Sequence, residues 1–307
     1  MSAIAHQPLQ LLLPALSRFD PAHPLRQWLR RGDPLPPGPA GDLAGLAGYF
    51  TSNTQPLPAA ALTRDLLAGD ATDHVWLSAD PAWVQPDLNG ARLLACGGLQ
   101  LSTVDAQALA GPLKPVFDEA GMTLETTTPN RWHLRLPAGT ALPAFNAPEQ
   151  ALGEDLLQHL PQGAEGRRWR VLLNDVQVLL HQHPLNRERA VQGLAPVNSV
   201  WLWGGGALPS RVHSELAGVL GEDPLLLALA ARAGIESQPR TPERVAASRA
   251  GWLVDLHDVT VDELAARWWP TFETLARRQS LLVHFNSGER WRLRPWHRWR
   301  IWRGAKA

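Results

Sequence analysis

The chain has 307 residues, and its 29 basic and 29 acidic side chains give a formal net charge of zero. This length is enough for one large domain or two small ones, and 45% hydrophobic with 19% charged residues is typical of a globular protein. Zero net charge excludes a large global field that would attract nucleic acid or an anionic membrane. The single cysteine, Cys96, excludes a disulfide framework and cysteine-based zinc motifs.

The first half of the chain predicts short strands and helices between loops rich in proline and glycine. In chain order we expect a buried strand at 10–13, a loop at 32–58, a helix at 59–67, strand pieces at 75–77, 91–95 and 99–101, a helix at 103–120, and a strand pair at 122–126 and 131–136. Pro112 and Pro115 predict a break in the helix at 103–120, because proline removes a backbone donor.

The second half predicts an alternation of helices and strands. We expect a helix at 168–182, a strand at 197–203, a helix at 224–233, a strand at 252–256, a helix at 261–278, and strands at 280–285 and 290–294. Short joints between strand and helix predict parallel strands with right-handed crossovers. The predicted fold class is α/β: a mostly parallel sheet with flanking helices, formed by 1–70 and 146–307, with a smaller inserted α+β subdomain at 71–145.

The first apolar run, 9–13, is too short for the core of a signal peptide, and Pro14 ends it. No stretch approaches the roughly 20 apolar residues of a membrane span. We therefore expect a cytoplasmic protein without a membrane partner.

The first candidate site follows the predicted strand at 197–203. A buried strand that ends in glycines presents bare backbone N–H groups at its carboxyl end, where open α/β sheets bind ligands. Arg189 adds a guanidinium fork suited to phosphate or carboxylate. The predicted partner is a small anionic metabolite, held by His183, Asn186, Arg189, Asn198, Trp203, Gly204, Gly205 and Gly206. The alternative is that Asn186 and Asn198 cap turns and that the glycines fit tight geometry.

A second candidate is a metal cluster at the end of the strand 252–256. Asp255, His257 and Asp258 combine two carboxylates and an imidazole, which suits a divalent ion such as manganese or zinc. The alternative is that Asp258 begins the next helix. We expect no cofactor, with the divalent metal as the alternative.

The segment 290–303 interleaves arginine with tryptophan. This composition suits stacking on single-stranded nucleic acid, but it also suits an edge strand that covers a core while arginine faces water. The period of two in 290–294 favours the edge strand, so nucleic acid is not the expected partner. The chain has 14 tryptophans beside a single tyrosine, which leaves room for a protein partner or a homodimer.

The segment from His183 to Gly206 resembles that of the archaeal-type cofactor-independent phosphoglycerate mutases, which are metal-dependent enzymes of the alkaline phosphatase superfamily. The chain as a whole is similar to the bacterial RpfE-type regulatory protein family. That similarity is carried by Ala79–Pro81, Arg131–Trp132, Leu172–Asn186 and Asn198–Gly206. The resemblance implies an alkaline-phosphatase-like core.

The chain departs from the mutase pattern at the catalytic positions. The mutases need an aspartate at the end of the first strand, a phospho-acceptor serine or threonine, and several metal ligands. Here the first strand ends in Leu13-Pro14, Ser17 and Ser52 are weak acceptor candidates, and Trp203 replaces an arginine. The resemblance thus implies a non-catalytic regulatory protein. The alternatives are a phosphoryl-transfer enzyme built on the second candidate site, and a nucleic-acid-binding regulator that uses the arginine and tryptophan segment.

Overall fold

The computed structural model describes residues 7–87 and 90–300. The chain divides into two compact units. Unit 1 combines Met1–Asn53 with Arg211–Ala307, and unit 2 is Thr54–Ser210. No helix in the described ranges is both long and apolar enough to cross a membrane.

Unit 1 is built on a seven-stranded sheet with the order β11-β10-β12-β1-β13-β14-β2. The first five strands of this order are parallel, and the last two pair antiparallel. The strands are β1 (Leu9–Leu13), β2 (Asp33–Leu35), β10 (Gly218–Leu220), β11 (Glu236–Gln238), β12 (Trp252–Asp255), β13 (Leu281–Phe285) and β14 (Arg290–Leu293). The mostly parallel sheet with helices around it confirms the predicted α/β class.

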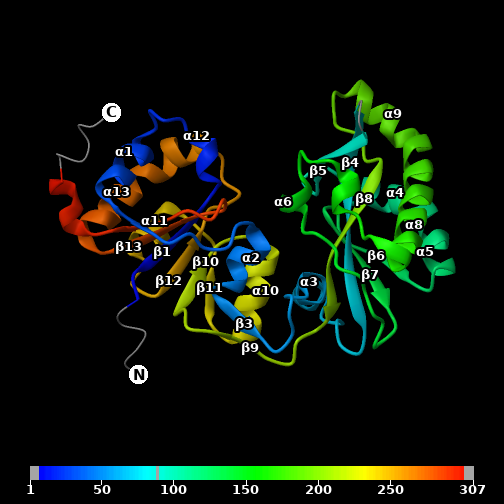
Figure 1. Ribbon diagram of the computed structural model, residues 1–307, viewed down its shortest axis with the longest axis horizontal. Helices are drawn as coiled ribbons and strands as arrows, with labels where there is room; N and C mark the ends of the chain where they lie inside the picture. The colour runs from blue at the N-terminus through cyan, green and yellow to red at the C-terminus, as the bar shows by residue number, and fades with distance from the viewer. Residues whose placement is uncertain (1–6, 88–89, 301–307) are drawn as a thin grey trace. The chain divides into compact units, whose positions relative to one another are not determined.

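The two faces of this sheet are covered differently. Odd-numbered leucines of the fully buried β1 pack into an apolar core with α1 (Pro24–Arg31), α11 (Pro242–Ala247) and α13 (Trp269–Arg278). Figure 1 shows these three helices on one side of the sheet, and α2 (Asp42–Ala47) and α10 (Pro224–Ala233) on the other. A small sheet of β3 (Phe50–Ser52) and β9 (Val212–Ser214) completes the unit. The face toward α2 carries polar residues of β1 and β13, notably Gln10 and His284.

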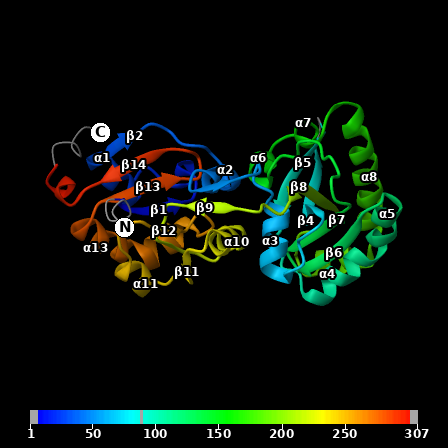
Figure 2. The same ribbon diagram turned by 90° about the horizontal axis from the view of Figure 1, so that it is seen from below.

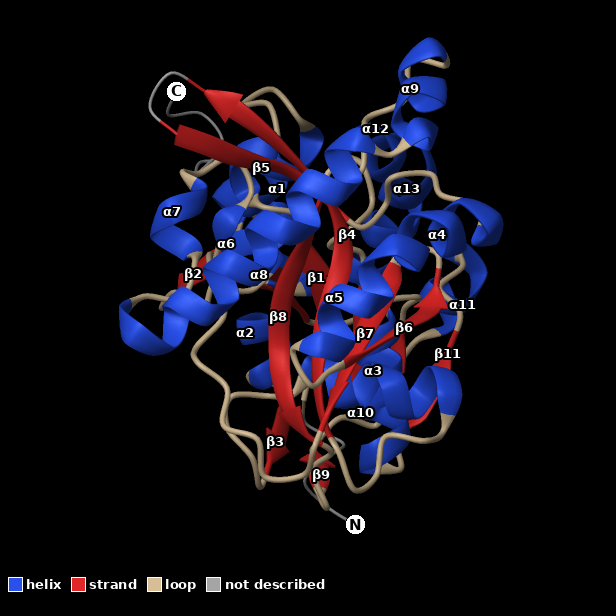
Figure 3. Ribbon diagram, turned by 90° about the vertical axis from the view of Figure 1, so that its right-hand side faces the viewer, coloured by secondary structure: helices blue, strands red, loops and turns tan. Residues whose placement is uncertain are grey.

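Unit 2 is built on an antiparallel sheet with the order β5-β4-β7-β6, in which β8 also pairs with β4. Its strands are β4 (Val75–Asp87), β5 (Gly90–Cys96), β6 (Thr123–Thr128), β7 (Arg131–Leu136) and β8 (Ser199–Ala207). The helices are α3 (Ala59–Ala68), α4 (Thr103–Ala110), α5 (Lys114–Glu119), α6 (Pro148–Ala151), α7 (Leu156–His159), α8 (Gly163–Gln182) and α9 (Pro184–Val191). Figure 2 shows the sheet of this unit beside α8, and Figure 3 shows β8 alongside β4.

The bounds of the inserted unit differ from the expected 71–145. Unit 2 reaches to Ser210 because β8 pairs with β4, and because α8 shares the apolar core of that sheet through Trp169, Leu173 and Val176. Hydrophobic periodicity predicted β8 and α8 as elements but could not identify their partners. The prediction therefore assigned both elements to the parallel core, whereas they belong with the antiparallel sheet of unit 2.

Several local expectations also change. The expected loop at 32–58 contains β2, α2 and β3, and the expected strand at 99–101 is irregular. Pro184 begins α9, where proline is tolerated at the first helical position. The helix expected at 103–120 is broken into α4, a 3-10 turn at Gly111–Leu113, and α5, as its prolines predicted. Of the segment 290–303, residues 301–303 lie outside the described residues.

The glycines of β8 provide a test of how tightly this strand packs. A Cβ added at Gly204 would lie 2.8 Å from the Cβ of Ala59 in α3, and its φ of +62° is unfavourable for an L side chain. We expect Gly204→Ala to lower the free energy of unfolding by about 1–3 kcal/mol, measured by urea unfolding.

The matched control is Gly45→Ala, in the helix α2. Nothing lies within 4 Å of a Cβ at Gly45, and its backbone is helical. This variant should leave the stability unchanged or raise it slightly. Equal stability of the two variants would show that α3 does not press on β8.

Candidate functional site

The carboxyl ends of three neighbouring parallel strands of unit 1 lie at one edge of its sheet. The register pairs Leu12 of β1 with Asp255 of β12 on one side and with His284 of β13 on the other. In open α/β sheets, ligands bind at this edge. The central strand supplies no acid here, because β1 ends in Leu13 and is followed by Pro14.

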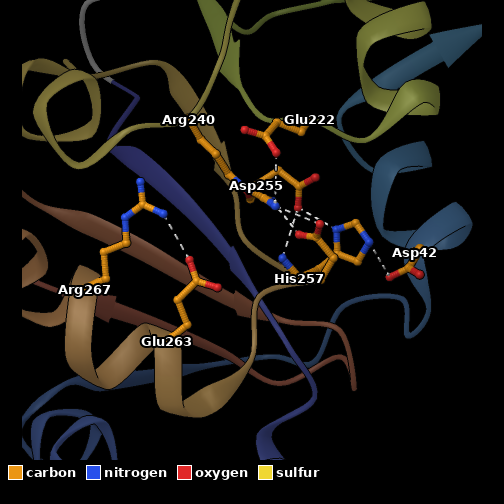
Figure 4. A network of polar contacts seen from close by, with 8 residues as sticks. Asp42, Glu222, Arg240, Asp255, His257, Glu263 and Arg267 are labelled. Carbon is orange, nitrogen blue, oxygen red and sulfur yellow. Dashed lines mark hydrogen bonds and ion pairs between the residues drawn. The ribbon is translucent and has the colours of Figure 1, made fainter. Parts of the chain in front are cut away.

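A polar network occupies the β12 side of this edge (Figure 4). Asp255 is fully buried, and its Oδ1 accepts hydrogen bonds from His257 Nδ1 at 2.7 Å and from the His257 backbone N–H at 3.3 Å. His257 Nε2 faces Asp42 Oδ1, at 3.6 Å. The imidazole of His257 therefore lies between two carboxylates.

This arrangement changes the charge of the imidazole. Burial alone would lower the pKa of His257, but the hydrogen bond and charge of Asp255, together with Asp42 and Asp223, raise that pKa to about 10. His257 is therefore an imidazolium at neutral pH, and an imidazolium has no free lone pair with which to bind a metal ion.

Asp258, the third member of the predicted cluster, faces a different partner. Both of its carboxylate oxygens accept hydrogen bonds from Arg240, with Nη2 at 2.7 Å from Oδ2. The same guanidinium donates to the backbone oxygen of Asp255 at 3.0 Å and lies 3.8 Å from Glu222. Although burial opposes it, Arg240 holds the pKa of Asp258 below its ordinary value.

The predicted metal residues are thus neighbours, but their groups are engaged with other partners. Asp255 neutralises His257, and Asp258 neutralises Arg240. Over residues 7–87 and 90–300, no three His, Cys, Asp or Glu side chains are arranged to hold a metal ion. The two-metal centre of phosphoryl-transfer enzymes therefore does not fit these residues.

The other predicted site, from His183 to Gly206, lies in unit 2 and not at the edge of the parallel sheet. The Asn186 side chain donates to the backbone oxygens of Leu180 and Val197 and accepts from Val197 N–H, at 2.8–2.9 Å. Asn198 likewise exchanges two hydrogen bonds with the backbone of Val84. These contacts favour the alternative interpretation, in which both asparagines fix loops.

The remaining members of that site also have structural partners. Arg189 is 3% exposed and donates to the backbone oxygens of Ala195 and Leu99. His183 caps α9, and the Trp203 indole donates to the buried Asp80 at 2.9 Å. The three glycines lie inside β8. The polar side chains of this set thus already have hydrogen-bond partners within unit 2. Ligand binding by these residues stays a prediction.

The arginine and tryptophan segment is partly folded into unit 1. Arg294 and Arg300 pair with Asp33 at 2.8 and 2.5 Å. Trp296 and Trp299 remain 49% and 66% exposed. The expected strand at 290–294 is present as β14, but it is not an edge strand, because it pairs with β13 on one side and with β2, the last strand of the sheet, on the other. Nucleic-acid binding by the exposed tryptophans stays a prediction.

A feature that sequence reasoning missed is a cavity of about 350 Å³ on the α2 face of the unit 1 sheet. Its wall includes Gln10 of β1, His284 of β13 and Arg290 of β14, with Tyr49 from the opposite layer. Only the polar side chains that interrupt the apolar strands at 10 and 284 could have signalled it.

Comparisons with known proteins reveal local similarity to phosphoglycerate mutases. No family model matches the chain. A probable 2,3-bisphosphoglycerate-independent phosphoglycerate mutase of Geobacter sulfurreducens is 42% identical over 62 residues, which are 20% of this chain and 16% of that protein. The corresponding mutase of Methanothrix thermoacetophila is 38% identical over 76 residues, 24% of this chain and 19% of that protein. The match thus spans less than a fifth of the length of either relative.

Two solved structures are similar to the chain at low sequence identity. A cofactor-independent phosphoglycerate mutase from Thermoplasma acidophilum has a TM-score of 0.42 and 13% identity, over 94% of this chain and 89% of that one. A protein from Pyrococcus horikoshii has a TM-score of 0.46 and 11% identity, over 94% and 86%.

The asparagine contacts in unit 2 can be tested on the free protein. Asn186→Ala should lower the free energy of unfolding by about 2–4 kcal/mol, because it leaves buried backbone groups of Leu180 and Val197 without partners. Urea unfolding measures this, with the exposed Gln192→Ala as control. A stable Asn186→Ala protein would contradict the loop-fixing role and favour a ligand-binding one.

The raised pKa of His257 makes stability depend on pH. The folded chain holds this proton more tightly than the unfolded chain, so the stabilisation is complete below about pH 6.5 and is lost as pH rises through about 10. As pH rises across this window, the free energy of unfolding of the unmodified protein should fall by up to about 1.4 kcal/mol more per pH unit than that of His257→Gln.

Urea unfolding at several pH values measures the two slopes. The exposed His213→Gln, in the same unit, should keep the slope of the unmodified protein. Parallel curves for His257→Gln and the unmodified protein would refute the imidazolium assignment.

Proposed function

We propose that this chain is a non-catalytic regulatory protein of the RpfE type, with an alkaline-phosphatase-like core, that works in the cytoplasm and binds a small anionic metabolite. The residues shared with that family and the local similarity to phosphoglycerate mutases support the kinship. The proposal departs from the mutases in activity, because the catalytic positions have changed.

The observation that carries the proposal is the internal neutralisation of the acids at the strand ends. Two-metal phosphoryl transfer needs carboxylates that are free to hold cations, which then stabilise the phosphoryl oxygens. Here Arg240 donates hydrogen bonds to both carboxylate oxygens of Asp258, and the charged His257 forms an ion pair with Asp255. Both acids are thus paired with cations of the protein itself.

One observation favours the alternative, a phosphoryl-transfer enzyme with a reduced metal site. The second carboxylate oxygen of Asp255 is buried and has no hydrogen-bond partner among the described residues. A single carboxylate oxygen is too few for the four ligands of a structural zinc site. Binding without catalysis therefore remains the stronger proposal.

Metal content and activity decide between the two proposals. Protein purified without chelator should hold well below one manganese or zinc ion per chain, and neither ion should raise its melting temperature. Conversion of 3-phosphoglycerate and hydrolysis of p-nitrophenyl phosphate should stay at the level of a blank.

The control variant is Asp255→Asn, which removes the buried charge. One or two metal ions per chain, with a phosphoryl-transfer activity that Asp255→Asn abolishes, would overturn the non-catalytic proposal and establish the alternative.

A further inference from the structure

The cavity on the α2 face of unit 1 has a polar wall that its surroundings leave unsatisfied. Four side chains of this wall carry a buried polar atom without a hydrogen-bond partner among the described residues: the Tyr49 hydroxyl, His284 Nε2, Asn286 Oδ1 and Arg290 Nε. A buried polar atom to which nothing bonds destabilises the fold, because it has lost its hydrogen bonds to water. Four of them around one cavity indicate that something polar binds there.

The charge of the wall defines the kind of ligand. Arg290 has no ion-pair partner in the part of the chain that the structure describes, and its side chain lies under Gly38, whose Cβ position is 3.0 Å from Arg290 Cδ. The one carboxylate of the lining, Glu215, is exposed and accepts a hydrogen bond from Gln7 at 3.0 Å. Arg290 therefore presents to the cavity a positive charge with which no carboxylate of the lining pairs.

The side chains of His284 and Tyr49, which lie beside Arg290, are neutral at physiological pH. Burial and the charge of Arg290 lower the pKa of His284 to about 4. Burial is also the main cause that raises the pKa of the Tyr49 phenol. The two rings lie 5.6 Å apart between centroids, so a neutral imidazole and a neutral hydroxyl stand beside the arginine. One positive charge with neutral donors matches a singly charged anion better than a doubly charged phosphate ester.

The rest of the lining suits a small organic body. Leu12, Leu216 and Phe285 are apolar, and several glycines let the backbone approach closely. Gln10 is only 7% exposed and adds an amide to the polar side. The volume of about 350 Å³ is at the lower end of the range of roughly 300–1,000 Å³ found for small-molecule sites.

We infer that this cavity is the ligand site of the protein, and that it takes a small organic monocarboxylate whose carboxylate pairs with Arg290 and the Tyr49 hydroxyl. The inference rests on the proposed binding function and locates it in unit 1, away from the glycine segment of unit 2. It requires neither metal nor catalysis.

Binding measurements on the full chain test this assignment. The probes are lactate, pyruvate, glycerate and benzoate, and inorganic phosphate and 3-phosphoglycerate serve as the more highly charged comparison. Binding is measured by isothermal titration calorimetry and by the shift in melting temperature. At least one monocarboxylate should bind saturably. Arg290→Gln should weaken it about 10- to 100-fold and Tyr49→Phe about 3- to 10-fold, because each loses a hydrogen bond to the anion.

Matched variants separate binding from folding. Arg278→Gln, at an exposed arginine of the same unit, should leave the affinity unchanged. Arg290→Gln and Tyr49→Phe should melt no lower than the unmodified protein without ligand, because their polar groups have no partner to lose.

Three results would overturn the assignment. These are the failure of every monocarboxylate to bind, equal binding by Arg290→Gln, and tighter binding of 3-phosphoglycerate than of glycerate. If any of them occurs while metal and activity stay absent, only the cavity assignment fails. Bound metal with phosphoryl transfer would instead defeat the proposed function.

Discussion

The pairing of β1 between β12 and β13 is the constraint on which the rest of unit 1 depends. Because the three strands are parallel, their last residues meet at one edge, and a fully buried β1 allows no charge of its own there. Every charged group at this edge is therefore supplied by a neighbouring strand or loop. The two sides of β1 differ in how these groups are paired.

On the β12 side, each of the two acids at the strand end has a cationic partner within the protein. Asp255 faces an imidazolium, and Asp258 faces a guanidinium, so neither acid needs an external cation. In the buried pair of Asp255 and His257, removing one partner leaves an uncompensated charge, which costs more than the pair contributes. The network is consequently a structural element that links β12 to Arg240 and to Asp42 of α2.

The sequence predicts local structure well and partners poorly. Apolar spacing predicted β1, α8, α10 and β13 close to their bounds, because each buries one face or a whole strand. It could not reveal that β8 pairs antiparallel with β4 across more than a hundred residues, so the expected ligand site was assigned to the wrong kind of sheet edge. The pairing of Asp258 with Arg240 was equally invisible, since nothing in the spacing of 18 residues indicates a contact. Residue types alone show which side chains can bind a ligand, but not which of them already form hydrogen bonds with the backbone.

On the β13 side, the positive charge of Arg290 has no carboxylate partner among the described residues, so the two sides of β1 differ. Arg290 lies on β14, next to His284 in the antiparallel register, and both face the cavity together with Tyr49. An arginine that no carboxylate of the described residues pairs with is suited to bind an anion, because that pairing offsets part of the cost of desolvating its charge. The acids at the end of β12 are therefore paired with cations of the protein, whereas Arg290 has no carboxylate partner among the described residues. This difference matters for the proposed function, because an anion can bind beside a protein cation without a metal ion.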